Sequence, residues 1–431
     1  MTAAGTIRRF VNGLLRGEPP AATHAFDIAV VGCAFDGDAR DPEALLSRYH
    51  SLVEWADALA NAGAGRVIVV QRFRDDRVLR RGAVAYHFVS DGGPPFPSPA
   101  FWGRRVARVL RALNPAIVHL DGLIFPAFVR HLRMSLPRRT TILVQDHGGI
   151  HERSVVFRSP MRRTFFRWGL RAADGFLFTT RDQAVPWQRA GIIGRSQPVY
   201  EVLESSTDLA SRQLPSSGER RLPGRPAVLW VGKLDSNKDP LTVLEGFEKA
   251  IASFPDAALT LVFHEARLLP EVTARIATAP ALRSRVHLLG AVDREALPPL
   301  YASADLFVLG SHHEGAGYAL IEALSFGVTP VVTDIPSFRV LTDGGQLGAL
   351  FAPGDPVELA RALERLGAAD FAARRQTVRA HFERELSWTA VARSAVEVYR
   401  AASAARRQST GRRLGSPADD DLEARRFAPP E

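Results

Sequence analysis

Residues 306–333 read LFVLGSHHEGAGYALIEALSFGVTPVVT. A short apolar run at 306–309 leads through a polar, glycine-containing loop into an apolar helical stretch, and a second apolar run follows at 331–333. Short apolar runs separated by a helix are typical of parallel strands in a sheet that is buried on both faces. This stretch therefore predicts an α/β fold.

The same alternation of strand and helix extends through most of the chain. Further strands are predicted at 26–32, 66–70, 117–120, 141–144, 175–178, 227–231, 259–262 and 286–289, and helices at 42–61, 103–113, 161–173, 240–253 and 388–402. The pattern breaks once, in a stretch rich in Ser, Pro, Gly and Arg at 209–226, which reads as a linker. We therefore expect two Rossmann-like, doubly wound parallel sheets, one on each side of the linker.

The predicted domain boundaries follow from this pattern. At 431 residues the chain is too long for one compact core. We expect an N-terminal extension at 1–23, a first Rossmann-like domain at 24–207, a linker at 208–226, a second Rossmann-like domain at 227–380, a C-terminal helix at 381–402 and a disordered tail at 403–431. Ligands of such sheets bind at the carboxyl ends of the strands, so a site is expected in a cleft between the domains.

The composition is ordinary for a soluble globular protein. Hydrophobic residues make up 46% and charged residues 23%, and no apolar run is long enough to span a bilayer. Residues 1–23 lack the features of a secretory signal, and Cys33 is the single cysteine, which we interpret as a small buried filler. These features predict a cytoplasmic protein without internal disulfides.

The net charge of +9 favours anionic partners such as phosphorylated substrates or acidic lipid. Nucleic acid is not expected as a partner, because no nucleic-acid-binding motif accompanies the charge. Almost all the basic residues are arginine, since lysine occurs only at Lys233, Lys238 and Lys249. Two of the three lysines therefore follow one predicted strand, in Val231-Gly-Lys-Leu-Asp-Ser-Asn-Lys238, where they can supply point charges for phosphate.

The loop at 310–317 carries the second group of candidate residues. Gly315 and Gly317 allow backbone N–H groups to approach a ligand closely, and the helix N-terminus that follows favours an anion such as a diphosphate. Glu314 lies in the loop and Glu322 in the helix after its first turn, where a carboxylate can bind ribose hydroxyls. We interpret both glutamates as functional.

These motifs resemble the retaining glycosyltransferases of sequence family 4, which have the GT-B fold. Glu314 and Glu322 match the family's E-x7-E motif, 231–238 matches its VG(R/K)L…K segment, and 300–315 matches a further stretch. The segment 382–388 with Tyr399 resembles the C-terminal helix that crosses back to the first domain in this family. The likeness covers 227–400 strongly and 24–205 more weakly.

The resemblance implies a role for each candidate residue. Lys233 and Lys238 would bind the donor diphosphate, Glu322 the ribose and Glu314 the donor sugar, and His147 would face the transferred sugar from the first domain. The residues assigned to catalysis are Glu314, Lys233, Lys238 and His147, and those assigned to donor binding are Gly232, Gly315, Ala316, Gly317, Tyr318, Ala319 and Glu322. No cofactor and no metal are expected.

We therefore predict a retaining, metal-independent glycosyltransferase that uses a nucleotide-sugar donor and a glycan or lipid-linked acceptor. The donor nucleobase, the sugar and the acceptor stay open. A nucleotide-sugar epimerase or phosphorylase on the same fold, and a non-catalytic nucleotide-sugar-binding protein, are the alternatives.

Four short stretches allow a second interpretation. His312-His313-Glu314 and Asp36-Gly-Asp38 resemble metal ligands, but adjacent side chains in an extended loop diverge, and the aspartates lie at the end of the first strand, where we favour an ordinary turn. Residues 161–171 mix arginines with aromatics, and we favour a helix that directs Phe165, Trp168 and Ala172 to the core over one that binds lipid. Residues 6–17 form a basic amphipathic pattern that could contact the inner face of an anionic membrane.

Overall fold

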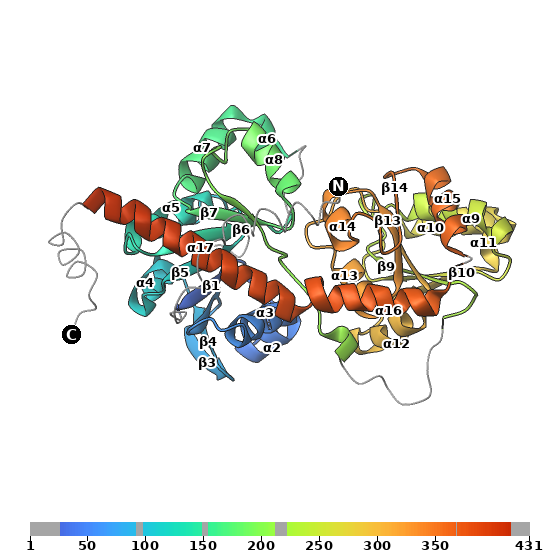
Figure 1. Ribbon diagram of the computed structural model, residues 1–431, viewed down its shortest axis with the longest axis horizontal. Coiled ribbons are helices and arrows are strands. Elements are labelled where there is room, and N and C mark those ends of the chain that lie inside the picture. Colours follow the sequence, from blue (N-terminus) through green and yellow to red (C-terminus); the bar gives the residue numbers. More distant parts are fainter. Residues whose placement is uncertain (1–25, 92–97, 149–153, 212–221, 368, 415–431) are drawn as a thin grey trace, which may run out of the picture. The chain divides into compact units, whose positions relative to one another are not determined.

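The computed structural model describes residues 26–91, 98–148, 154–211, 222–367 and 369–414, and these form two compact units (Figure 1). The N-terminal unit ends at Ser205 and takes in the residues from Trp388 onward, and the C-terminal unit comprises Ser206–Ser387. Each unit is a sheet of mostly parallel strands with helices packed on it, so the predicted class of two α/β domains is confirmed.

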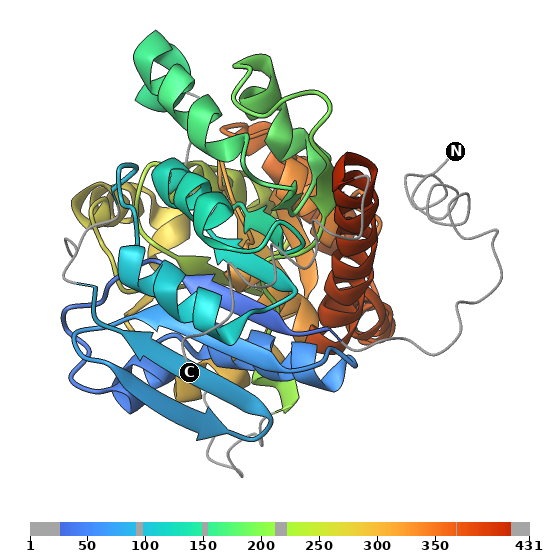
Figure 2. The same ribbon diagram turned by 90° about the vertical axis from the view of Figure 1, so that its left-hand side faces the viewer.

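The N-terminal unit is built on an eight-stranded sheet with the order β3-β4-β2-β1-β5-β6-β7-β8. All neighbouring strands are parallel except β3 and β4, which form an antiparallel hairpin seen as blue strands in the foreground of Figure 2. The strands are β1 (Ile28–Gly32), β2 (Val67–Arg72), β3 (Arg77–Arg81), β4 (Val84–Val89), β5 (Ile117–Asp121), β6 (Thr141–Gln145), β7 (Gly175–Phe178) and β8 (Val199–Glu201).

Helices cover both faces of this sheet. One face carries α4 (Arg104–Leu113), α5 (Pro126–Ser135), α6 (Val155–Arg158), α7 (Pro160–Leu170) and α8 (Arg181–Arg189), and the other carries α2 (Pro42–Arg48), α3 (His50–Asn61) and α17 (Trp388–Leu414). Successive residues of β1 serve the two cores in turn, since Ala29 and Val31 face the first set of helices while Ile28 and Val30 face the second. This is why the central strands read as continuous apolar runs.

Two features of the N-terminal unit differ from the sequence prediction. The helix expected at 42–61 is two helices, because Tyr49 leaves helical geometry (φ −103°, ψ 52°), and its side chain hydrogen-bonds to Asp36 in the loop after β1. The hairpin of β3 and β4 was not predicted. β3 lies at the edge of the sheet and is mostly exposed, so it lacks the apolar run that marks a buried strand.

Helix α7 presents only part of the expected face to the core. Ala172 is buried after the end of the helix and Phe165 packs partly on the core, as expected, but Trp168 is 39% exposed, so the expectation that Trp168 faces the core is wrong; the fully buried residues of the helix are Phe166, Gly169 and Leu170. Gly169 decides the face: a Cβ atom there would lie 2.2 Å from the carbonyl oxygen of Pro126. Helix α5 therefore approaches α7 at the glycine, and this contact leaves the neighbouring Trp168 on the outer side of the helix.

The C-terminal unit is a six-stranded, fully parallel sheet with the order β11-β10-β9-β12-β13-β14. Its strands are β9 (Ala227–Gly232), β10 (Ala258–Phe263), β11 (Val286–Gly290), β12 (Leu306–Leu309), β13 (Thr329–Thr333) and β14 (Ala349–Phe351). Its helices are α9 (Pro240–Ala250), α10 (Leu269–Thr278), α11 (Pro280–Arg283), α12 (Leu297–Ser303), α13 (Tyr318–Ser325), α14 (Pro336–Leu341), α15 (Pro356–Gly367) and α16 (Phe371–His381). Strands β9 and β12 are neighbours at its centre.

The chain leaves the C-terminal unit through a π-helical segment, Phe382–Leu386, and α17 begins at Trp388 and packs against α3. The predicted helix continues to Leu414, so the disordered tail expected at 403–431 is wrong for 403–414, while 415–431 lies outside the described residues. Arg406 explains the difference: it donates to the carbonyl oxygen of Arg138 at 2.7 Å and pairs with Asp174 at 3.1 Å. Arg406 thus has acceptors in two other segments of the N-terminal unit.

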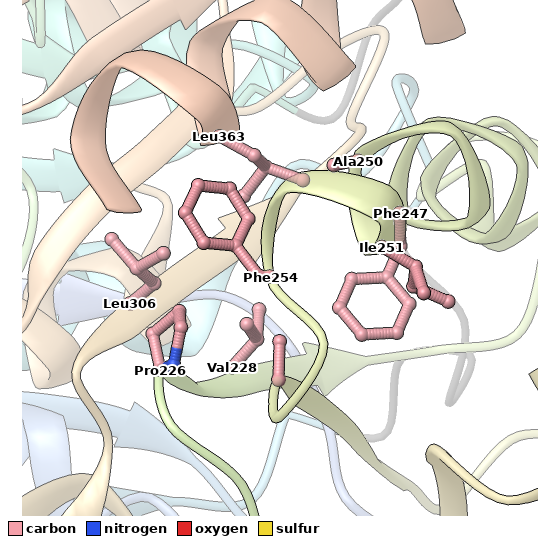
Figure 3. Close-up of a pocket in the computed structure, with 9 residues that line it drawn as sticks. Pro226, Val228, Phe247, Ala250, Ile251, Phe254, Leu306 and Leu363 are labelled. Carbon is pink, nitrogen blue, oxygen red and sulfur yellow. The ribbon is translucent and has the colours of Figure 1, made fainter. Parts of the chain in front are cut away.

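A pocket at the amino ends of β9 and β12 is lined by nine apolar residues, among them Val228, Phe247 and Leu306 (Figure 3). It offers no polar side chain that could orient a sugar or a phosphate, and it lies at the edge of the sheet opposite the carboxyl ends. Among the described residues, no helix is long and apolar enough to cross a membrane.

Candidate functional site

The loops that follow β9 and β12 lie together at the carboxyl edge of the C-terminal sheet. Asn237 joins them, since its side-chain amide donates to the carbonyl oxygen of His313 at 3.0 Å and its Oδ1 accepts from the His313 N–H at 3.1 Å. Its own carbonyl oxygen accepts from the N–H of His312 at 2.8 Å. The two stretches singled out in the sequence thus form one structure.

Lys238 and Glu314 are brought into direct contact by these loops. Nζ of Lys238 pairs with Oε1 of Glu314, and their side chains are only 17% and 12% exposed. The Asp235 carboxylate accepts from the N–H groups of Asn237 and Lys238 at 3.0 Å and 2.9 Å and so shapes the turn that carries the lysine. A cation and an anion predicted to act at one site therefore do lie at one site.

Lys233 has a different partner. Its Nζ lies 2.7 Å from Oε1 of Glu265, which follows β10, and this hydrogen bond lowers the pKa of the Glu265 carboxyl. The two side chains are 45% and 43% exposed. Glu265 was not predicted as part of the site, because nothing in its local sequence pairs it with a residue on the neighbouring strand.

The glycine-containing loop enters α13 at Gly317, which has a positive φ of 70°. A Cβ atom there would lie 2.9 Å from the ring of Phe338, so both backbone and space favour glycine. Ala316 is buried, Ala319 is half-buried and Tyr318 is exposed at the start of the helix. The predicted helix N-terminus is thus formed beside the Lys238–Glu314 pair, because Glu314 belongs to the same loop.

Glu322 is held from two sides within the second turn of α13. Its Oε1 lies 3.2 Å from Nη1 of Arg294, and the Tyr301 hydroxyl donates to its Oε2 at 3.0 Å. Burial and then the Glu322 carboxylate raise the pKa of Tyr301 well above its ordinary value, which keeps the hydroxyl protonated as a donor. Arg294 and Tyr301 were not predicted as site residues; Tyr301 lies within the matched motif, and Arg294 has no local signal.

The possible metal ligands of the loop point to separate partners. His312 Nε2 lies 3.0 Å from Oδ2 of Asp239, His313 pairs through its backbone with Asn237, and Glu314 contacts Lys238. Within the described ranges, no group of three or more His, Cys, Asp or Glu side chains converges as a metal site would require.

His147 follows β6 in the N-terminal unit and is flanked by two carboxylates. Its Nε2 lies 3.5 Å from Oδ1 of Asp121, which ends β5, and its Nδ1 contacts Oε2 of Glu204, which follows β8. Desolvation alone would lower the pKa of His147, but the hydrogen bonds and charges of Asp121 and Glu204 raise it well above its ordinary value of 6.5. The imidazole is 43% exposed, so a charged ring remains accessible from solvent.

A second histidine continues this cluster into the core. His119 is buried on β5, with its Nε2 3.7 Å from Asp121 and its Nδ1 bonded to the hydroxyl of Tyr399 on α17. Burial lowers the pKa of His119 to about 4, so this ring is neutral at neutral pH. Asp121 and Glu204 were not predicted as site residues from the sequence. Asp121 ends β5 and Glu204 follows β8, and this position at the carboxyl end of a parallel strand is the signal that could have identified them.

Asp36-Gly-Asp38 forms an ordinary turn, as favoured from the sequence. Oδ1 of Asp36 accepts from the N–H groups of Asp38 and Ala39 at 2.8 Å and 3.2 Å, and its Oδ2 pairs with Arg48 at 2.7 Å. Cys33 is 1% exposed, and burial raises the pKa of its thiol well above the ordinary value, which agrees with a structural filler.

Residues 225–368 match the family model of the "Glycosyl transferases group 1". The chain is also 28% identical over 314 residues to the GDP-mannose:cellobiosyl-diphosphopolyprenol alpha-mannosyltransferase of Xanthomonas campestris, a match that covers 68% of this chain and 76% of that protein. The chain is a glycosyltransferase. The matched family segment contains both loops of the site, from β9 through α13.

Two further likenesses bear on this glycosyltransferase. The phosphatidyl-myo-inositol mannosyltransferase of Mycobacterium tuberculosis is 31% identical over 146 residues, which covers 32% of this chain and 37% of that protein. The solved structure of sucrose-phosphate synthase from Thermosynechococcus elongatus superposes with a TM-score of 0.61 at 20% identity, covering 88% of this chain and 100% of that chain. The latter match confirms the fold as GT-B.

Proposed function

We propose that this glycosyltransferase is a retaining, metal-independent member of sequence family 4 and transfers a hexose from a nucleotide-sugar to a lipid-linked or polysaccharide acceptor. One observation carries the proposal: two buried or nearly buried glutamates of the E-x7-E motif flank the N-terminus of α13, and each has a cationic partner already in place. This arrangement supplies positive charge, backbone N–H groups and carboxylate acceptors along one edge of one sheet.

The donor diphosphate would bind Lys238, Lys233 and the N-terminus of α13. An ammonium group has three donors, so Lys238 can contact a phosphate oxygen while it still contacts Glu314. Lys233 is paired in an exposed position, where a strong anion competes easily with Glu265. The positive end of the helix dipole adds to the attraction at Gly317.

Glu322 would accept hydrogen bonds from the donor ribose. Arg294 and Tyr301 each occupy one of its oxygens and hold the carboxylate in one rotamer. A carboxylate oxygen has a second lone pair, so each oxygen can still accept a ribose hydroxyl. The two partners therefore preorganise the group instead of blocking it.

The family resemblance assigns the sugar to Glu314 and His147. By that resemblance Glu314 would bind a sugar hydroxyl, and the charged His147 ring would donate a hydrogen bond to the transferred sugar. Asp121 and Glu204 are positioning residues in this proposal, because they keep that ring protonated and oriented.

The proposed reaction places the acceptor hydroxyl on the same side of the donor sugar as the departing diphosphate. The hydroxyl oxygen forms the new bond to the anomeric carbon, the bond to the diphosphate breaks, and a diphosphate oxygen takes the hydroxyl proton. Lysines and the helix N-terminus stabilise the charge that develops on the leaving group. The anomeric configuration is thereby retained.

The acceptor proposal rests on the relatives. The Xanthomonas protein is named for a diphosphopolyprenol acceptor and the mycobacterial protein for a phosphatidylinositol acceptor. A lipid-linked acceptor agrees with the predicted cytoplasmic location and with peripheral contact at the inner face of a membrane. The N-terminal helix predicted at 6–17 lies outside the described residues.

The decisive experiment is a thermal-shift panel of GDP-, UDP-, ADP- and dTDP-sugars, beginning with GDP-mannose, followed by donor turnover with and without lipid-linked glycans. A ligand at ~100 times its Kd stabilises the folded state by ~2.7 kcal/mol, so the correct donor is readily found. Turnover that requires an acceptor supports transfer. Isomerisation of the donor alone, phosphorolysis, or binding without turnover would instead support an epimerase, a phosphorylase or a binding protein.

A further inference from the structure

An exposed cluster of aromatic rings lies on the outer side of helices α4, α5 and α7. Trp102 packs edge-on against Trp168 with ring centroids 6.2 Å apart and against His131 at 5.5 Å, and Phe165 stacks on Trp168 at 5.8 Å. Both tryptophans are 39% exposed. We call these four residues the aromatic cluster.

The exposure of the cluster is built into the backbone. Met161, Phe165 and Trp168 follow the spacing i, i+4, i+7 and form one face of α7, while Phe166, Gly169 and Leu170 form a second face that is buried. Met161 at the start of the exposed face is 80% exposed. Helix α7 is therefore apolar on two faces: the second is buried, and the first is partly covered at Phe165 but exposed at Met161 and Trp168.

A glycine follows Trp102 and packs closely on helix α5. Gly103 has a positive φ of 56°, and a Cβ atom there would lie 2.5 Å from the ring of Phe128. Phe101 before Trp102 is buried, whereas Trp102 is exposed. Each tryptophan of the cluster thus adjoins a glycine that contacts α5 closely.

The surface around the cluster is basic and free of acidic residues on its helices. Helices α4, α5 and α7 contain nine arginines and no Asp or Glu: Arg104, Arg105, Arg108, Arg111, Arg130, Arg133, Arg162, Arg163 and Arg167. Arg130 lies over the Trp168 ring at 5.8 Å from its centroid. Burial and then the charge of Arg104 lower the pKa of His131.

Some of these arginines are used within the fold. Arg167 donates to the carbonyl oxygen of Gly191, Arg133 to that of Thr140, and Arg105 pairs with Asp76. Arg104, Arg108 and Arg162 are exposed. The outer side of the layer thus combines exposed Trp and Met side chains and the half-buried Phe165 with exposed arginine residues.

We propose that this surface docks on an anionic lipid bilayer. Tryptophan favours the membrane interface, where its ring is buried among headgroups and its N–H stays hydrated, and guanidinium groups are attracted to acidic headgroups. A nucleic acid would use the arginines but would leave the exposed Met161 side chain in water, so a bilayer fits the whole surface better. The inference goes beyond the proposed function and depends neither on the proposed acceptor nor on residues 1–23.

The test is sedimentation of the full chain with vesicles of phosphatidylcholine alone and with 30% phosphatidylglycerol. We expect binding to the anionic vesicles that weakens in high salt, and at least tenfold weaker binding for Trp102→Ser/Trp168→Ser. The matched control, Leu288→Ala/Val357→Ala, removes two exposed apolar side chains elsewhere and should bind as the wild type does. The contribution of charge is tested by comparing vesicle binding of the Arg104→Gln/Arg162→Gln variant with that of a control, Arg80→Gln/Arg283→Gln, which removes two arginines elsewhere.

Two further measurements separate the possible outcomes. Brominated acyl chains should quench the fluorescence of the wild type more than that of the double tryptophan variant. Phe10→Asp/Leu14→Asp tests the N-terminal segment, and binding lost in this variant but unchanged in the tryptophan variant would overturn the proposal.

A donor thermal shift that is unchanged in the tryptophan variant shows that the fold and the donor site are intact. A loss of vesicle binding can then be distinguished from a failure of the proposed reaction. Absence of vesicle binding, or capture of a protein at this surface in place of lipid, would also overturn it.

Discussion

Nζ of Lys238 contacts the carboxylate of Glu314, although the two residues are 76 positions apart in the chain. The contact joins the loop after β9 to the loop after β12, and both side chains are mostly shielded from water. Lys238 and Glu314, which were each predicted from a separate motif, therefore form an ion pair with each other.

Replacing Lys238 should mainly reduce turnover. Lys238→Gln keeps a donor for Glu314 but removes the charge that would stabilise the departing diphosphate, so kcat should fall by roughly 10² to 10³. Lys249→Gln is the matched control, because Lys249 is an exposed lysine on α9 that pairs with Glu245 one turn away. Steady-state kinetics measure both, and near-wild-type kcat in Lys238→Gln would remove the basis for this assignment.

Replacing Glu322 should mainly weaken donor binding. Glu322→Gln keeps contacts to Arg294 and Tyr301 but loses the charge on the ribose acceptor, so donor Kd should rise by roughly tenfold, as expected for a hydrogen bond to a charged group. Calorimetry with the donor gives the value. Glu383→Gln, on an exposed glutamate paired with Arg379, should leave Kd unchanged, and equal effects of the two variants would count against the ribose assignment.

The His147 cluster predicts a defined pH dependence of stability. The folded-state pKa of His147 is raised, so its stabilisation is fully present below its ordinary pKa of 6.5 and is lost as the pH rises through the higher folded value. The pKa of Asp121 is lowered, so its contribution is present above its ordinary value of 3.8 and is lost as the pH falls through the lower one.

Glu204→Gln tests this cluster because it removes one of the two charges beside His147. The stability difference from the wild type should be largest near pH 6 and should shrink at alkaline pH, and the His147 resonance in an NMR titration should move to lower pH. The neutral His119, with a pKa of about 4, serves as an internal reference that should shift little. An unshifted His147 titration would contradict the assigned role of Glu204.

Turnover should persist in EDTA. Lys233, Lys238 and the helix N-terminus would supply the positive charge that a divalent ion supplies in metal-dependent transferases. The assay compares initial rates after exhaustive EDTA treatment with rates after Mn²⁺ or Mg²⁺ is restored. Complete loss in EDTA that Mn²⁺ reverses would return attention to Asp36 and Asp38.

The product should keep the anomeric configuration of the donor sugar. This expectation rests on the E-x7-E motif at Glu314 and Glu322 and on attack from the side of the leaving group. NMR coupling constants of the first-formed product decide the matter. An inverted product would place the enzyme in another mechanistic class.

Much of the fold was predictable because parallel strands buried on both faces must be apolar throughout. The apolar runs at 117–120, 141–144 and 306–309 are typical of such buried strands. Each is a strand in the structure. The edge strand β3 and the break at Tyr49 were not predictable by the same reasoning. An edge strand needs no apolar run, and Tyr49 departs from the helix where its side chain meets Asp36.

The sequence by itself determined the two-domain α/β architecture and the local frame of the donor loops, since apolar runs, glycines and motif spacing act over a few residues. Tertiary structure alone decided which side chains meet. Arg294 reaches Glu322, Glu204 reaches His147 and Tyr399 reaches His119 only because strand order and helix packing bring distant segments together. The outward face of α7 was decided in the same way, by the close approach of Pro126 to Gly169. Such contacts depend on the whole fold, and no local sequence pattern predicts them.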